Sequence, residues 1–128
     1  MSSTTRGSIT GTFGMTMHVH DLGRVTKFWG SLGLDPQQLD ADTASLPIPG
    51  SGPITLHRWQ TACATNGGRP PGTVSGILLA VDDANAMCDR VGAAGGKVVT
   101  PPFRPETGGS WAVVADPDGN EFMVCAPK

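Results

Sequence analysis

The side chains most able to do chemistry in this chain are His18, His57 and Glu121. A neutral imidazole can act as a general base, and a carboxyl group can act as an acid or a base when burial adjusts its pKa. Imidazole and carboxylate groups are also metal ligands, and an imidazole can simply hydrogen-bond to a bound molecule. The sequence leaves these three roles open. Which one applies depends on the elements that position the three residues.

Strand alternation predicts which side chains share a surface. In the segment 15–19 the two methionines and the valine point to one face, where a helix should cover them. The segment 54–59 alternates in the same way, with Ile54 and Leu56 toward a helix. His20, beside a predicted helix cap, is expected at a loop edge. The side chains left on the uncovered, concave face are Thr16, His18, Thr55, His57 and Trp59.

A repeat of strand, helix cap and helix end indicates that the chain consists of two similar halves. In each half an aspartate can cap a helix by accepting a bond from a first-turn amide. A glycine at the same distance after each aspartate can end that helix in the left-handed conformation. Apolar residues recur at helical spacing in between, with Trp29 on the apolar face and expected in the core. The pairs at one common separation are Val19 and Val81, Asp21 and Asp83, and Gly33 and Gly95, which argues for duplication.

The segment 116–120, Asp-Pro-Asp-Gly-Asn, predicts a tight turn. Proline fixes φ, the aspartates can accept bonds from backbone amides two residues on, and Gly119 or Asn120 tolerates positive φ. The flanking segments 110–115 and 121–125 resemble strands. The sequence therefore predicts a β-hairpin here.

These patterns together predict an α+β fold in which the order β-α-β-β-β occurs twice. The remaining strands are expected at 37–41, 43–47 and 97–100, and a proline- and glycine-rich joint separates the halves. A Ser/Thr-rich start without an apolar stretch reads as a disordered tail, not an export signal. The predicted organisation is a tail at 1–11 and one domain at 12–126, made of module one at 12–65, a joint at 66–72 and module two at 73–126.

Composition excludes several classes of function. A net charge of −2 with scattered basic residues offers no electrostatic footprint for nucleic acid. No apolar stretch approaches the roughly 18 residues that a membrane-spanning helix needs. The cysteines, Cys63, Cys88 and Cys125, are odd in number and have no metal-like spacing. They predict reduced thiols and a cytoplasmic protein.

Several short motifs follow one another in a definite order: Val19-His20-Asp21-Leu22, Phe28-Trp29, Leu32-Gly33-Leu34, Val81-Asp82-Asp83 and the turn at 116–120. In this order and spacing the chain resembles the vicinal oxygen chelate superfamily, which includes glyoxalase I, bleomycin-resistance proteins and extradiol dioxygenases. The resemblance covers residues 12–126. It implies two βαβββ modules whose mixed sheets curl around a ligand cavity, with the helices on the convex side.

Metal enzymes of that superfamily place ligands at matched points of the two modules. The corresponding positions here are Gly14, Gly76 and Met123, with a fourth position aligned to His57. Glycine has no side-chain donor, a thioether is a poor ligand for a hard divalent ion, and one imidazole cannot hold a metal alone. The resemblance therefore leads us to expect no metal and no other cofactor. The remaining metal alternative is a relocated site formed by His18, His57 and Glu121 across the cavity.

The resemblance then points to the metal-free, bleomycin-resistance-like branch, which binds and sequesters a hydrophobic or aromatic small molecule. It implies a homodimer with cavities between the chains, in which the joint would allow modules to be exchanged. One alternative is a metal-free isomerase, cyclase or lyase that uses His18, His57 or Glu121, and another is a metal-dependent glyoxalase- or dioxygenase-type enzyme. Phe103, in the proline-rich segment 101–105, is expected to overhang the pocket. The expected ligand contacts are Thr16, His18, Thr55, His57, Trp59, Phe103, Trp111 and Met123.

Overall fold

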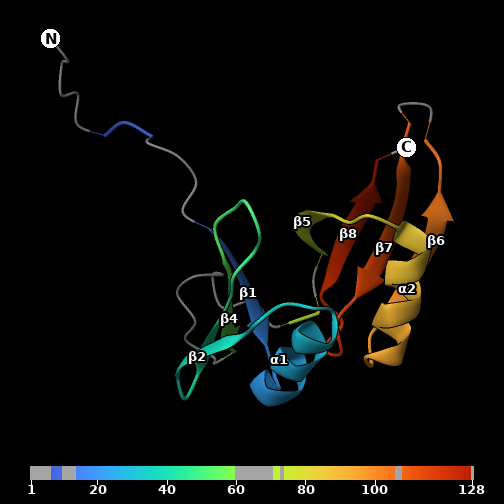
Figure 1. Cartoon of the computed structure of the whole chain (residues 1–128). Helices are drawn as coiled ribbons and strands as arrows, with labels where there is room; N and C mark the ends of the chain where they lie inside the picture. The colour runs from blue at the N-terminus through green and yellow to red at the C-terminus, as the bar shows by residue number, and fades with distance from the viewer. Residues whose placement is uncertain (1–6, 10–13, 60–70, 73, 106–107, 128) are drawn as a thin grey trace, which may run out of the picture.

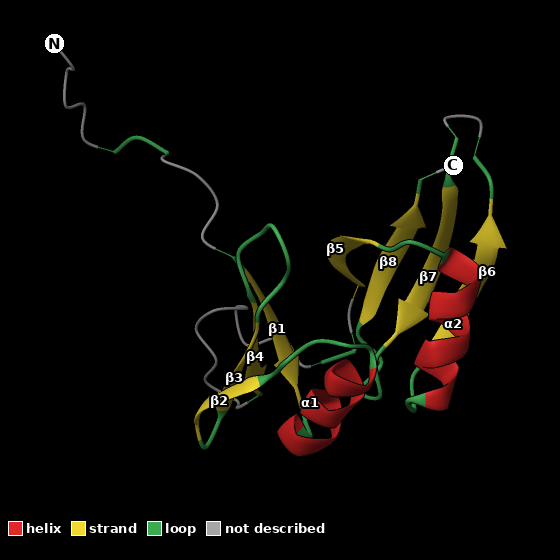
Figure 2. Ribbon diagram, viewed as in Figure 1, coloured by secondary structure: helices red, strands yellow, loops and turns green. Residues whose placement is uncertain are grey.

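The computed structural model describes residues 7–9, 14–59, 71–72, 74–105 and 108–127. Within these ranges the chain forms two helices and eight strands (Figures 1 and 2). The first half of the chain contains β1 (Met15–Val19), α1 (Leu22–Ser31), β2 (Gln37–Asp40), β3 (Thr43–Leu46) and β4 (Ile54–Arg58). The second half contains β5 (Val74–Ala80), α2 (Ala84–Ala93), β6 (Lys97–Phe103), β7 (Ser110–Ala115) and β8 (Glu121–Ala126). The predicted β-α-β-β-β order in each half is confirmed.

The two helices begin and end as the repeat predicts. The Asp21 side chain accepts a hydrogen bond from Arg24 N at 3.0 Å, and the Asp83 side chain accepts one from Ala86 N at 3.0 Å. Gly33 follows α1 with a φ of +100°, a conformation in which a side chain would be strained. Capping at one end and a left-handed glycine at the other therefore set the length of each helix.

The strands form two separate four-stranded sheets of identical topology, in the orders β1-β4-β3-β2 and β5-β8-β7-β6. In each sheet the first pair is parallel and the other two pairs are antiparallel. The sheets do not close into one curled sheet within the chain. Figure 1 shows them as two separate sheets. Helix α1 packs against β3 and β4, and α2 packs against β6, β7 and β8.

Strand β6 is longer than the sequence predicts, because it continues through Pro101 and Pro102 to Phe103. Proline lacks a backbone donor, so it is tolerated in a strand that has a neighbour on one side only. Strand β6 pairs only with β7, and its register shifts twice along that pairing. The expected end of this strand at residue 100 is therefore wrong: residues 101–103 belong to the edge strand, and Phe103 lies opposite Trp111.

One hydrophobic core is shared by both modules. The helix-facing side chains of β1, β3 and β4 and those of β7 and β8 belong to a single buried cluster. Trp29 of α1 is 1% exposed, and its ring centroid lies 4.8 Å from that of Phe122 on β8. The predicted core position of Trp29 is confirmed. Aromatic contact of this kind joins the two halves at the centre of the molecule.

The turn at 116–120 connects the two modules through polar contacts that a hairpin does not require. The Asp118 carboxylate accepts bonds from the backbone amides of His20, at 2.7 Å, and Asp21, at 3.1 Å, where β1 passes into α1. Arg24 donates to the Pro117 carbonyl oxygen at 3.0 Å. Amides that would otherwise lack a partner at the start of α1 are thus satisfied by the other half of the chain.

Asn120, 2% exposed, completes this connection from the inside. Its side-chain amide donates to the His18 carbonyl oxygen at 2.9 Å and to Asp116 Oδ2 at 3.1 Å. Its side-chain oxygen accepts a bond from Gly72 N at 2.9 Å. Burial raises the pKa of the Asp116 carboxyl group, while hydrogen bonds from Asn120 and Asp118 act in the opposite direction. We call Asp116, Asp118 and Asn120 the module lock.

Candidate functional site

The open face of the first sheet, the side away from α1, is polar. Cross-strand pairing places Thr16 of β1 beside Thr55 of β4, and Thr55 beside Ser45 of β3. The parallel row next to it contains His18, His57 and Thr43. Ile54 and Leu56 are fully buried on the other face, as alternation predicts. Hydroxyl and imidazole groups therefore line this surface, which we call the polar face.

His18 and His57 are cross-strand neighbours on the polar face. Their ring centroids lie 5.6 Å apart with the planes tilted by 31°. His18 is 4% exposed, and the pKa of its imidazole is lowered, first by burial and then by repulsion from His57. A neutral imidazole in this setting can accept or donate one hydrogen bond, or accept a proton from a bound molecule.

The open face of the second sheet, away from α2, is mainly apolar, although Thr100 of β6 and Glu121 of β8 also lie on it. One row runs from Leu78 of β5 to Met123 of β8 and Val113 of β7. The next row runs from Ala80 to Cys125, Trp111 and Phe103. Leu78 is 49% exposed and Phe103 is 43% exposed, so large apolar side chains meet solvent here. We call this surface the apolar face.

The predicted contact residues divide between these two faces. Thr16, His18, Thr55 and His57 lie on the polar face, and Trp111, Phe103 and Met123 lie on the apolar face. Trp59 follows β4 and makes an edge contact with the exposed His20, with centroids 5.6 Å apart. The sequence analysis missed Leu78, Val113 and Cys125, although alternation places Val113 and Cys125 with Trp111 and Met123.

The superfamily's metal-ligand positions do not fit a metal in this structure. A Cβ atom on Gly14 would lie 2.6 Å from the Pro53 carbonyl oxygen, and Gly76 has a φ of +75°, where a side chain would be strained. Met123 offers only a thioether. The backbone itself, and not only the choice of side chain, therefore disfavours ligands at two of these positions.

The relocated metal site is not formed within one chain. Glu121 lies on β8, paired with Ala115 of β7, whereas His18 and His57 lie on the first sheet. The described residues contain no group of three or more histidine, cysteine, aspartate or glutamate side chains placed to hold a metal ion. The structure thus brings His18 and His57 together and leaves Glu121 apart from them.

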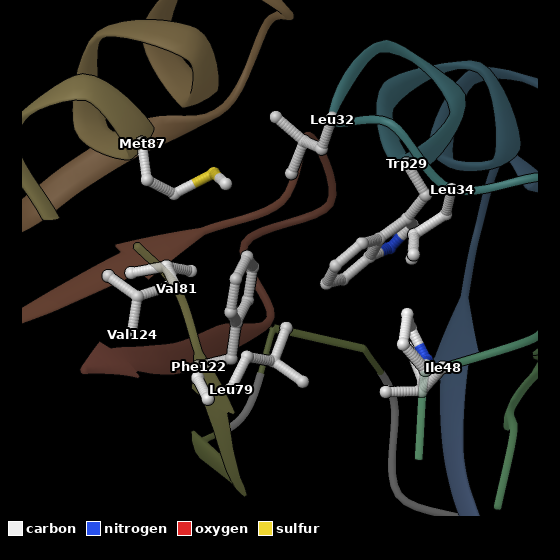
Figure 3. Close-up of a pocket in the computed structure, with 11 residues that line it drawn as sticks. Trp29, Leu32, Leu34, Ile48, Leu79, Val81, Met87, Phe122 and Val124 are labelled. Atoms are coloured by element: carbon white, nitrogen blue, oxygen red, sulfur yellow. The ribbon is translucent and has the colours of Figure 1, made fainter. Parts of the chain in front are cut away.

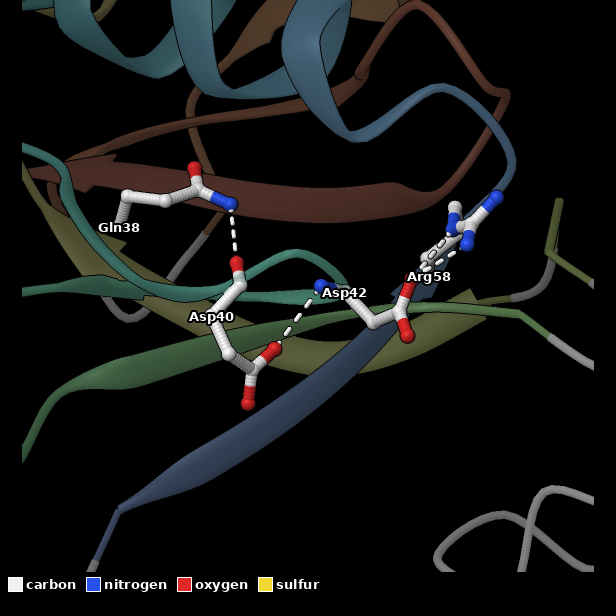
Figure 4. A network of polar contacts seen from close by, with 4 residues as sticks. All are labelled: Gln38, Asp40, Asp42 and Arg58. Carbon is white, nitrogen blue, oxygen red and sulfur yellow. Dashed lines mark hydrogen bonds and ion pairs between the residues drawn. The ribbon is translucent and has the colours of Figure 1, made fainter.

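A charged cluster lies at the β2–β3 end of the first sheet (Figure 4). Arg58 Nε donates to Asp42 Oδ1 at 2.7 Å and the two side chains form an ion pair, both of them solvent-accessible. The backbone amide of Asp42 donates to Asp40 at 2.8 Å, and this bond is the main cause of the lowered pKa of Asp40. The Gln38 side chain donates to the Asp40 carbonyl oxygen. These groups are hydrated and form a rim, not a buried site.

An apolar pocket of about 190 Å³ lies between the modules, and Ala80 is the one residue named on either open face that also lines it. None of the predicted contact residues lines it. Its walls come from the end of α1, the loop between β3 and β4, the end of β5, and the inner sides of α2 and β8. Sequence patterns mark these side chains only as apolar, because the pocket exists only where the two modules meet.

Comparison with known proteins identifies one family of similar chains. A family model described as the Glyoxalase/Bleomycin resistance protein/Dioxygenase superfamily matches residues 12–124. The solved structure of TnmS3, an antibiotic binding protein from Streptomyces sp. CB03234, is 26% identical with a TM-score of 0.73, covering 94% of this chain and 98% of that one. A superfamily member from Sphaerobacter thermophilus is 25% identical with a TM-score of 0.74, covering 92% and 98%.

Similarity to curated proteins is more limited. "Putative glyoxylase CFP32" of Mycobacterium bovis is 41% identical over 51 residues, which is 40% of this chain and 20% of that protein. The match thus spans about a fifth of the relative's length. In the described part of this chain, neither helix has the length and hydrophobicity needed to cross a bilayer.

Proposed function

The chain belongs to the Glyoxalase/Bleomycin resistance protein/Dioxygenase superfamily, and from that premise we propose that it binds and sequesters a hydrophobic or aromatic small molecule without a metal. The observation that carries this proposal is the apolar face, where Leu78, Met123 and Trp111 form a continuous surface. A flat, apolar surface with an indole ring suits a planar ligand. The poor fit of a metal at positions 14, 76 and 123 supports the metal-free branch of the superfamily.

A second copy of the chain would complete the binding site. Strands β1 and β5 each pair on one side only, and the apolar face is exposed in a single chain. Exposed apolar surface of this kind is typical of an interface or a ligand site. We infer a homodimer in which the polar face of one chain meets the apolar face of its partner. The ligand would then stack on Trp111 and hydrogen-bond to His18 or His57.

The similarity to TnmS3, an antibiotic binding protein, supports sequestration of a natural product. At 26% identity the likeness supports the class of ligand and not its identity. Cytoplasmic location belongs to the same proposal, because Cys88 and Cys125 are free thiols, which a reducing compartment maintains.

The competing function is metal-free acid–base catalysis. The specific observation in its favour is the imidazole pair at 5.6 Å, in which the lowered pKa keeps His18 neutral at pH 7. A neutral imidazole close to a bound substrate could transfer a proton. This function would be favoured if the protein converts a ligand chemically and the His57→Gln variant no longer does so. Unchanged ligand recovered at one molecule per site would favour sequestration.

The first test measures metal content and binding together. Protein purified without an affinity tag is analysed for transition metals and titrated with the planar apolar dye 8-anilino-1-naphthalenesulfonate, before and after a chelator. We expect no stoichiometric metal, chelator-independent binding, and weaker binding in Trp111→Ala than in the matched Trp59→Ala variant. Stoichiometric metal, or binding abolished by the chelator, would overturn the metal-free proposal.

A further inference from the structure

The pocket between the modules has walls made almost entirely of hydrocarbon. Figure 3 shows the ring of Phe122 between Met87 on one side and the ring of Trp29 on the other, with Leu79 below Phe122. The single side-chain polar atom in the wall, Trp29 Nε1, is buried and has no hydrogen-bond partner among the described residues. The lining side chains thus offer an occupant aromatic and aliphatic contact and no charge.

Such a pocket differs from an ordinary gap in packing. Protein cores contain few voids larger than a water molecule, and apolar voids of this size hold water poorly. Five of the lining residues pack against the core but stay only partly buried: Leu34, Ile48, Leu79, Val81 and Met87. They keep apolar surface accessible at the mouth of the pocket, where an incoming molecule could cover it. Met87 can adapt its shape to what enters.

Size and lining together define the occupant. An engineered cavity of about 150 Å³ lined by leucine, isoleucine and phenylalanine binds benzene, whereas drug-sized ligands occupy about 300 Å³ or more. The present pocket, at about 190 Å³, is close to the first value. We propose that the pocket is a second binding site, separate from the two open faces, that takes one uncharged aromatic ring.

Occupancy of this site would act on the whole fold. The walls come from both modules, with Trp29, Leu34 and Ile48 from the first and Leu79, Met87 and Phe122 from the second. A molecule that binds between them stabilises the folded chain in proportion to its concentration relative to its Kd. The ring would therefore raise the thermal midpoint without touching the polar or the apolar face.

The test uses benzene as the probe and methyl groups as reporters. In the full chain with carbon-13-labelled methyl groups, benzene is titrated and chemical shifts are followed by NMR. We expect saturable shifts at the methyl groups of Ile48, Leu79 and Met87 and none at Leu78 or Met123. The thermal midpoint should rise with benzene and stay unchanged with benzoate, whose carboxylate has no partner in the pocket. Absence of saturable shifts at the pocket methyl groups would overturn the proposal.

Two adjacent residues of β5 provide the matched variants. Leu79 lines the pocket, and Leu78 points to the apolar face and does not line it. Leu79→Phe fills the pocket and should weaken benzene binding by about tenfold or more, whereas Leu78→Phe should leave it unchanged. Met87→Phe, on α2, provides a second filling variant should Leu79→Phe fail to fold.

The reverse ranking, with Leu78→Phe as the damaging variant, would assign benzene to the apolar face and overturn the second site. The second site would also be overturned if benzene binding is lost at high protein concentration while sedimentation shows that the protein forms a larger species. In that case the pocket is covered by a second copy of the chain. Dye binding to the apolar face is measured separately, so failure of either proposal is distinguishable from failure of the other.

Discussion

The two sheets of this protein have the same strand order, but their open faces differ in polarity. The open face of the first sheet carries Thr16 on β1 and Thr55 and His57 on β4. The open face of the second carries Leu78 on β5, Met123 on β8 and Val113 on β7. The helix-facing side chains of the inner strands are apolar and buried in both sheets. Side chains alternate between the two faces of a strand, so one face can keep its core residues while the other changes freely. Duplication therefore preserved the architecture while the open faces became chemically different.

Removing the module lock should produce the largest effect, because it holds the two different halves together. Asn120→Ala removes the partners of the Gly72 amide and of the His18 carbonyl, both of which are buried or partly buried. We expect the free energy of unfolding to fall by about 2–4 kcal/mol in urea titrations. The matched control is Asn85→Ala, an exposed position on α2, which should change it by about 0.5 kcal/mol or less. An equal effect of the two variants would contradict a structural role for the lock.

A charge introduced on each open face tests the contrast between them directly. In Met123→Glu the new carboxylate faces Leu78 and Val113, and we expect a loss of about 1–2 kcal/mol of stability together with a shift toward monomer in sedimentation. In Thr55→Glu the carboxylate stands among hydroxyl groups, and the loss should be smaller than about 1 kcal/mol. Comparable losses in the two variants would show that the faces do not differ in the way described.

Between about pH 8 and pH 5 the pH dependence of stability should report His18 on the polar face. Burial and His57 lower the pKa of His18 in the folded protein below the ordinary value of 6.5. As the pH falls through 6.5 the unfolded chain gains a proton before the folded one, so the free energy of unfolding decreases; above that pH it is unaffected. Urea titrations between about pH 8 and pH 5 should show this decrease, and His18→Gln should abolish it.

His57 and Asp116 provide controls for this pH experiment. His57→Gln removes the repulsive part of the shift at His18 and should reduce the decrease without abolishing it. Asp116 affects the free energy of unfolding in the opposite direction and at lower pH. Burial raises the pKa of its carboxyl group above 3.8, so the folded chain takes up this proton before the unfolded chain does, and the folded state is favoured. A slope near pH 6.5 that survives His18→Gln would assign the titration to another group.

The smallest effect is expected at the charged cluster beside the polar face. Arg58 and Asp42 form an exposed ion pair, and exposed pairs contribute little because water screens them. Arg58→Ala should change the free energy of unfolding by about 0.5 kcal/mol or less, and less still at high salt. The free energy of unfolding is measured by urea titration at two ionic strengths. A change as large as that of Met123→Glu would mean that the cluster is part of the site and not its rim.

Local patterns predicted much of the fold and part of the candidate site. The caps at Asp21 and Asp83 and the buried positions of Ile54 and Leu56 follow from short-range rules, and the structure confirms them. The neighbouring positions of His18 and His57 follow from alternation together with the pairing of β1 and β4. The predicted end of the strand at residue 100 was wrong, because a proline-containing segment can still extend a strand at the edge of a sheet.

The sequence by itself determined the two repeated modules, the ends of their helices and which face of each strand is buried. These features depend on side-chain alternation, helical spacing and capping, all of which act between residues close in the chain. Only the tertiary structure decided that Asp118 and Asn120 bind the other module, and that Trp29 and Phe122 meet beside an apolar pocket. Those contacts join residues about a hundred positions apart, so no local pattern specifies them and packing of the two modules does.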